Sequence, residues 1–248
     1  ALSIANTQIT GTLTGSQISS NTLSNTVFQT GSVENYMNAQ SFGMGMRNRI
    51  INGAMVIDQR NAGASLAATN GAYSVDRWQC ISYTGGATTG KFTAQQNAGS
   101  VTPPAGFSNY LGCTSSAATT VGSSDYYLIR QNIEGFNAAD LAWGTANAKT
   151  VTLSFWVYSS LTGSFGCSIQ NNGTPTPRSY PFSYTVSSAN TWTTISVTIA
   201  GDTTGTWLTT NGIGINVWFS MGAGSSFSGT AGSWGGGGAK VSATGAVS

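Results

Sequence analysis

Residues 150–159 read TVTLSFWVYS, and this stretch decides the fold class. Apolar side chains occupy every second position, and threonine, serine, tryptophan and tyrosine occupy the positions between them. A period of two places successive side chains on opposite faces of an extended chain, whereas a helix repeats about every 3.6 residues. The stretch therefore predicts a half-buried β-strand, with Val151, Leu153, Phe155 and Val157 facing inward and Thr152, Ser154, Trp156 and Tyr158 facing outward.

Two later segments alternate in the same way. TWTTISVTI (191–199) separates Ile195, Val197 and Ile199 from Thr194, Ser196 and Thr198. IGINVWFSM (213–221) is expected to turn Ile213, Ile215, Val217, Phe219 and Met221 inward and Asn216 and Trp218 outward. Further strands are expected near 50–58, 74–83, 90–96, 107–115, 126–134, 164–170 and 179–186, and one short helix at FNAADLAW (136–143).

Many short alternating strands separated by turn-forming residues are typical of an antiparallel sandwich. Asn172-Gly173, Asn211-Gly212 and Gly85-Gly86 are such turn signals. The sequence thus predicts an all-β, jelly-roll-like antiparallel β-sandwich head over residues 48–248.

Residues 1–30 follow a different rhythm. Their apolar positions, five or four residues apart, are Ile4, Ile9, Leu13, Ile18, Leu23 and Phe28. Neither a strand nor a helix has this period, but a repeat of short extended turns does, and such units become stable by stacking. We expect an extended repetitive shaft in which these residues form the seam of a homotrimer; a linker is the alternative. A neck over 31–47, with a short helix after Ser32, is expected to join the shaft to the head.

The composition limits the possible partners. Charged residues make up 6% of the chain, against a usual value of about 25%. The nine basic residues are dispersed, so the electrostatic footprint of a nucleic-acid-binding protein is missing. No apolar run is long enough to span a bilayer, so membrane insertion is not expected.

Catalytic chemistry has few candidate residues. The chain contains no histidine, which removes histidine-based triads and histidine metal ligands. Glu134 and Asp140 are the most suggestive carboxylate pair for a glycosidase, although Glu134 is equally suited to an ion pair with Arg130. Asp202 could ligate calcium, but a turn-forming role is preferred. We expect no enzymatic activity, no cofactor and no metal.

The cysteines and tryptophans carry the remaining expectations. Cys80, Cys113 and Cys167 are expected to be buried, reduced thiols. Trp156 and Trp218, on outward strand faces, are expected at a subunit interface. Trp207 and Trp234 lie in polar, glycine-rich loops, where an aromatic ring needs cover. A glycan or a neighbouring subunit could supply it.

Several segments together resemble the head region of tail-fibre and related appendage proteins of tailed bacteriophages. The resemblance rests on NRIINGAMVIDQRNAG (48–63) followed by YSVDRW (73–78), and on later pieces, namely RQNIEG (130–135), KTVTLSFWVYSS (149–160) and NTWTTISVTIAGDTTGTW (190–207). It implies a β-sandwich similar to carbohydrate-binding modules, in chains that are usually trimeric. Within YSVDRW, Trp78 is expected in the core, Arg77 on the opposite face, and Asp76 in an ion pair with Arg60 or Arg130.

The resemblance implies a virion structural protein, assembled in the host cytoplasm and acting outside the cell. Its expected partners are its own copies, other virion proteins and host cell-surface polysaccharide. Three alternatives stay open: a capsid-decorating or connecting virion protein, the sugar-binding module of a secreted enzyme, and a polysaccharide depolymerase.

Overall fold

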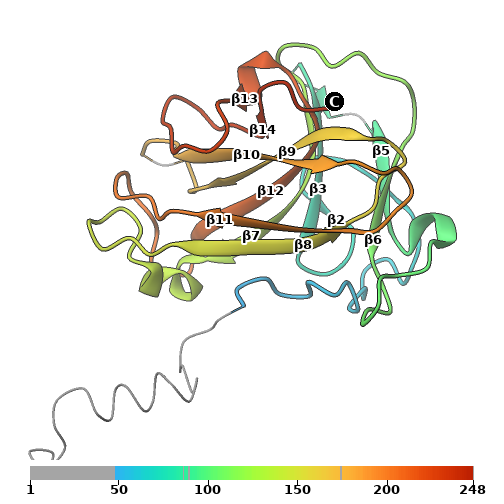
Figure 1. Ribbon diagram of the computed structural model, residues 1–248, viewed down its shortest axis with the longest axis horizontal. Coiled ribbons are helices and arrows are strands. Elements are labelled where there is room, and N and C mark those ends of the chain that lie inside the picture. The colour runs from blue at the N-terminus through green and yellow to red at the C-terminus, as the bar shows by residue number, and fades with distance from the viewer. Residues whose placement is uncertain (1–47, 86, 89, 174, 248) are drawn as a thin grey trace, which may run out of the picture. The chain divides into compact units, whose positions relative to one another are not determined.

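The computed structural model describes residues 48–85, 87–88, 90–173 and 175–247, which belong to one compact unit that begins at Asn48 (Figure 1). The predicted shaft (1–30) and neck (31–47) lie outside the described residues. The same holds for the seam residues Ile4, Ile9, Leu13, Ile18, Leu23 and Phe28, whose role stays a prediction.

The fold is all-β, with antiparallel pairing throughout its main sheets, as the sequence predicts. The largest sheet has the strand order β10-β9-β12-β7-β3-β2, with β4 attached to β3 (Figure 1). Its strands are β2 (Ala72–Tyr73), β3 (Trp78–Thr84), β4 (Ala87–Thr88), β7 (Tyr126–Glu134), β9 (Gly163–Gln170), β10 (Ser179–Val186) and β12 (Ile213–Ala223).

Two smaller sheets complete the main strands. β8 (Val151–Val157) pairs with β11 (Thr193–Ile199), and β5 (Phe92–Gln96) pairs with both β1 (Leu66–Ala67) and β6 (Leu111–Ser115). In β8 and β11 the register aligns the two apolar rows, so that Ile195 lies opposite Phe155 and Val197 lies opposite Leu153. These rows pack on buried residues of the large sheet, including Ile169, Val217 and Phe182, which forms the core of a β-sandwich. The alternation predicted at 150–159 and 191–199 is confirmed.

The other face of the large sheet is covered by the C-terminal segment. This segment contains the 3-10 turn η6 (Ser225–Phe227) and the short parallel pair β13 (Ser228–Gly229) and β14 (Ser242–Ala243). Val241 is fully buried there against Ile81, Leu128 and Trp218. The expectation that Trp218 faces outward is therefore wrong, since it is 8% exposed. Strand β12 is covered on both faces, so its alternation does not separate core from surface.

The strand expected near 50–58 is also absent, and turns occupy this stretch. Asn52 has a left-handed backbone conformation. Its side-chain N–H group donates to the backbone carbonyls of Ile57 and Asp76, and its side-chain oxygen accepts from the backbone N–H of Ile57. These bonds satisfy the loop without a strand partner, as asparagine side chains commonly do in turns.

The predicted helix at 136–143 is replaced by two 3-10 turns, η4 (Gly135–Asn137) and η5 (Ala139–Leu141). Ala142 follows in the left-handed region, at a φ of 52°, and ends the second turn. Another such turn, η3 (Ala98–Ser100), connects β5 to β6. No helix among the described residues is long and apolar enough to cross a membrane.

The burial of the cysteines and the pairing of the charged residues agree only in part with the sequence predictions. Cys80 and Cys167 are buried as predicted, but Cys113 is exposed on β6, and all three are free thiols. Trp78 lies in the core. Asp76 accepts a hydrogen bond from the backbone N–H of Gln59 at 2.7 Å and forms no ion pair with Arg60 or Arg130. Within the described part of the chain, the ion pairs are Arg49–Asp140, Arg77–Glu134 and Arg178–Asp202.

Candidate functional site

Three tryptophans from separate segments meet at one end of the sandwich, and we call them the tryptophan cluster. Trp143 follows η5, Trp207 lies in the β11–β12 loop, and Trp234 lies in the C-terminal segment. The ring centroids are 4.7 Å apart for Trp143 and Trp207, and 5.3 Å apart for each of the other two pairs. All three pairs are edge-to-face, a preferred arrangement for aromatic rings.

The indole N–H groups of the cluster are all used within the chain. Trp143 donates to the carbonyl of Lys149 at 2.7 Å, Trp207 to Thr204 at 3.2 Å, and Trp234 to Ala200 at 2.7 Å. Trp207 and Trp234 are half-buried, and their rings pack on each other. The rings therefore shield each other in part from solvent, a role for which the sequence suggested a glycan or a neighbouring subunit. What the cluster offers to a ligand is therefore ring surface.

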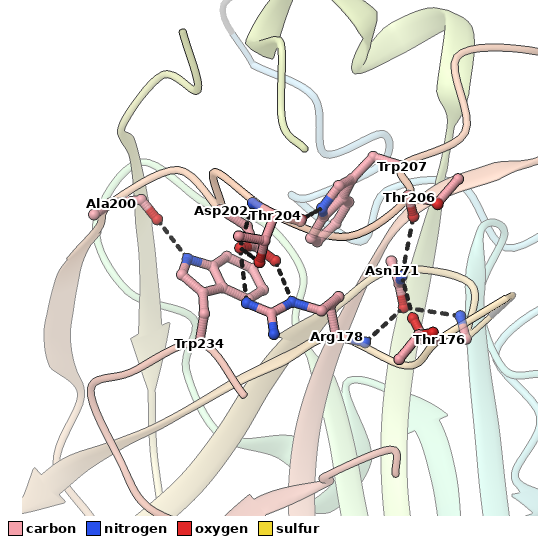
Figure 2. Close-up of polar contacts among 10 residues, drawn as sticks. Asn171, Thr176, Arg178, Ala200, Asp202, Thr204, Thr206, Trp207 and Trp234 are labelled. Carbon is pink, nitrogen blue, oxygen red and sulfur yellow. Dashed lines mark hydrogen bonds and ion pairs between the residues drawn. The ribbon is translucent and has the colours of Figure 1, made fainter. Parts of the chain in front are cut away.

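An ion pair fastens the loops around the cluster (Figure 2). Arg178, just before β10, donates from Nε and Nη2 to the two carboxylate oxygens of Asp202, at 2.7 and 2.8 Å. Asp202 is 2% exposed, and it also accepts from the backbone N–H and hydroxyl of Thr204. Burial raises the pKa of Asp202, but the Arg178 and Thr204 hydrogen bonds and the Arg178 charge outweigh it, so that its pKa lies below the usual value. Both carboxylate oxygens of Asp202, which the sequence suggested as calcium ligands, already accept hydrogen bonds from Arg178 or Thr204.

A buried amide organises the neighbouring loops. Asn171 donates to the carbonyls of Thr176 and Thr206, both at 3.0 Å, and accepts from the backbone N–H groups of Gly173 and Arg178 (Figure 2). Its side chain thus links the β9–β10 loop to the β11–β12 loop. A fully bonded buried side chain of this kind holds a loop in one conformation.

Two glycines allow the loops to approach closely. A Cβ atom on Gly205 would lie 2.6 Å from Cγ of Arg178, and one on Gly144 would lie 2.7 Å from the carbonyl oxygen of Gly205. Gly144 also has a φ of +84°, which favours glycine. The position of Trp207 against Trp143 depends on these contacts.

A cavity of about 280 Å³ lies beside Trp143 and Trp207. Its wall combines the two rings with small and apolar side chains and the threonines Thr145 and Thr209. The remaining lining residues are Ala138, Ala139, Ala142, Leu208, Gly214 and Ile215. An aromatic wall with a few hydroxyl groups suits a ligand that has both an apolar face and polar edges.

The sequence-predicted site residues divide into three groups. Trp207 and Trp234 come together, although Trp207 alone of the two lines the cavity. Trp156 is 42% exposed on the outer face of β8, away from the cavity lining, and its role at a subunit interface stays a prediction. Trp143 was not predicted as a site residue, because the segment 136–143 was expected to be a short helix. The glycine that follows Trp143 was the one signal in the sequence that indicated a loop at this position.

The carboxylates considered for hydrolysis are held by arginines. Glu134 pairs with Arg77, not with Arg130, and Asp140 pairs with Arg49, both at 2.7 Å. Partial burial raises the pKa of Glu134, but hydrogen bonds from Arg77 and Asn137 and the charge of Arg77 lower it overall. The hydrogen bond from Arg49 lowers the pKa of Asp140. A glycosidase acid needs the opposite shift, so neither group suits that role. Searched over the described residues, no cluster of three potential metal ligands occurs.

Comparison with protein-family models, curated proteins and solved structures returned no match to this chain.

Proposed function

We propose that this chain is a virion structural protein, a tail fibre or similar appendage, whose β-sandwich head contacts host cell-surface glycans. Three copies associate through the seam of residues 1–30, and other virion proteins hold the assembly. The head makes binding contacts only, and the molecule acts outside the host cell.

The cavity beside Trp143 and Trp207 is the observation that carries this proposal. A sugar ring has C–H groups on its faces and hydroxyls at its edges, so it fits ring surface bordered by Thr145 and Thr209. The surrounding loops are fixed by the Arg178–Asp202 pair and by Asn171, so the cavity exists before a ligand arrives. A preformed site lowers the entropic cost of binding.

The low charge and the sequence resemblance support the viral assignment. A surface of hydroxyls and amides suits a permanent extracellular assembly better than a soluble monomer, which normally relies on charge for solubility. Weak single-site binding is sufficient in a trimer, because linked copies raise the effective concentration of the second and third sites.

The glycan role can be tested with a substitution that fills the cavity and leaves the buried core residues unchanged. Ala139 is exposed and lines the cavity, so Ala139→Phe should occupy it. We expect the full chain to bind members of an array of bacterial surface oligosaccharides, and Ala139→Phe to weaken that binding at least tenfold. Ala105→Phe is the matched control, because Ala105 is also exposed but lies outside the cavity. Equal binding by all three proteins would remove the cavity from the proposal.

A capsid-decorating or connecting virion protein is the second candidate. Internal bonding of all three indole N–H groups favours it, since the tryptophan cluster also has a purely structural use. A full chain that forms a trimer but binds no member of the array would favour this candidate.

A further inference from the structure

The structure has a second, polar pocket of about 160 Å³, and some of its lining residues are close in sequence to residues that line the tryptophan cavity. It is lined by Tyr73, Arg77, Asn132, Glu134, Asn211 and Ile213. The β11–β12 loop serves both sites, with Trp207 to Thr209 at the cavity and Asn211 at the pocket. The chain that leaves β7 does the same, with Glu134 at the pocket and Ala138 at the cavity.

Gly135 lies between the two sites in sequence and packs on the β11–β12 loop. Its backbone N–H donates to the carbonyl of Gly212 at 2.7 Å, and a Cβ on Gly135 would lie 2.4 Å from the carbonyl oxygen of Leu208. The two segments that carry the sites are therefore held against each other.

Two buried atoms of the pocket residues have no hydrogen-bond partner among the described residues, namely Nε of Arg77 and Oδ1 of Asn132. One is a donor and the other an acceptor. Most buried polar atoms in proteins are paired, so two unpaired atoms in residues of one pocket call for an explanation. These two atoms are shielded from solvent, so they could bond a ligand hydroxyl only after their side chains rotate. The side chains of Arg77 and Glu134 are each about one-third exposed and line the pocket without any rotation.

The backbone of Arg77 gives an independent indication. Its φ is 76°, in the left-handed region that residues other than glycine, asparagine and aspartate rarely adopt. Met55, Ala62, Ser100 and Ala142 also have positive φ, but Arg77 has the largest value among them and its side chain pairs with Glu134 at 2.7 Å. Strained residues held in place by their surroundings cluster at binding sites.

We propose that this pocket is a second subsite that binds one neutral sugar ring, adjacent to the ring held by the tryptophan cavity. The proposal rests on the proposed glycan-binding function and assigns it a sugar class. Cavities of about 150 Å³ hold one benzene molecule, so the pocket has room for the six ring atoms of one sugar, whose remaining hydroxyls would extend out of it. Asn211 supplies an amide with no side-chain hydrogen bond among the described residues and Glu134 a carboxylate, and such planar groups can hydrogen-bond sugar hydroxyls.

The charge of the pocket selects a neutral ring. Arg77 and Glu134 neutralise each other, so a carboxylated sugar would have to displace Glu134 from Arg77 and then lie beside that carboxylate. A hydroxylated ring meets no such repulsion. Arg60 is not among the lining residues; its guanidinium lies over the ring of Tyr73, 4.9 Å from the ring centroid.

The test uses the full chain on the same array of neutral and carboxylated bacterial oligosaccharides. Asn211 lines the pocket, is exposed, and makes no side-chain hydrogen bond within the described part of the chain, so Asn211→Ala should leave folding unchanged. We expect this variant to bind neutral oligosaccharides about tenfold more weakly. Asn70→Ala is the matched control, because Asn70 is likewise exposed and precedes a glycine but lies outside both sites.

A second variant tests the charge argument. Glu134→Gln leaves the charge of Arg77 unbalanced, and we expect it to gain binding to carboxylated oligosaccharides that the unchanged chain does not bind. The thermal unfolding midpoint of each variant checks that it is folded.

The outcomes separate the two proposals. If the unchanged chain binds no oligosaccharide, the proposed function fails and this inference fails with it. If the unchanged chain binds, but Asn211→Ala binds as well as Asn70→Ala, the second subsite is wrong while the glycan function stands. A preference of the unchanged chain for carboxylated sugars would overturn the assignment to a neutral ring.

Discussion

At the residue scale, a few polar side chains hold the loops of the head in place. Asp202, Asn171 and Asn52 each hydrogen-bond groups in two segments that are not paired as strands. Their residue types were compatible with turns in the sequence. Their partners were not predictable, because Arg178 and Asp202 are separated by 24 positions and meet only in the folded chain.

Asp202→Asn should destabilise the head. The amide would place an N–H group opposite a donor of Arg178, and the guanidinium would lose its counter-charge. Arg178 is 18% exposed, so we expect a loss of about 2–3 kcal/mol, somewhat below the range for a fully buried pair. The measurement is the free energy of unfolding in urea. Asp140→Asn is the control, because the side chain of Asp140 is 53% exposed, so water solvates its carboxylate and the pair with Arg49 should contribute less than about 1 kcal/mol. Equal losses in the two variants would contradict this role of Asp202.

Acidification should remove the same interaction. The pKa of Asp202 is lower in the folded chain than the ordinary value of about 3.9, so the folded state binds the proton less readily than the unfolded state. Its stabilising contribution is therefore complete above about pH 4 and is lost as the pH falls through the folded pKa. Unfolding free energies between pH 7 and pH 2.5 should fall less for Asp202→Asn than for the unchanged chain. A parallel decline in the two proteins would argue against the coupling.

At the scale of elements, sequence periodicity predicts strands with one exposed face and fails for those with two covered faces. β8 and β11 alternate cleanly because solvent lies on their outer side. β12 carries the same alternation, but the C-terminal segment covers its second face, and Trp218 is buried there with Val241. The cover comes from residues far along the chain, which periodicity within one strand does not report. The sequence singles out Trp207 and Trp234 separately, as loop tryptophans, and does not predict that they meet Trp143, because the three residues lie on different segments.

Neighbouring substitutions in β8 test this face assignment. Phe155 packs toward the core against Tyr184 and Phe219, whereas Trp156 points outward. Since Phe155 is half-buried, Phe155→Ala should lower the unfolding free energy by about 2–3 kcal/mol, and Trp156→Ala by less than about 1 kcal/mol. Urea unfolding at a concentration where the chain is monomeric gives both values. The reverse order would mean that the strand faces are assigned wrongly.

At the scale of the whole molecule, we propose that the β-sandwich head carries two adjacent sugar subsites and is joined to a trimeric shaft. The sandwich class follows from the alternating strands and is confirmed by the structure. Trimer formation through Ile4, Ile9, Leu13, Ile18, Leu23 and Phe28 is a prediction from their spacing of about five residues. If the proposed shaft and subsites are both present, we expect them to act together, because three weak sites on one assembly bind a glycan-coated surface far more tightly than one site.

The most direct test of this account compares the full chain with a chain that begins at Asn48, at equal concentrations of heads, on a surface coated densely with one bound oligosaccharide from the array. The account predicts that the full chain binds at least about 100-fold more tightly, because only it links three heads. Equal affinity of the two chains, or absence of binding by both, would contradict it.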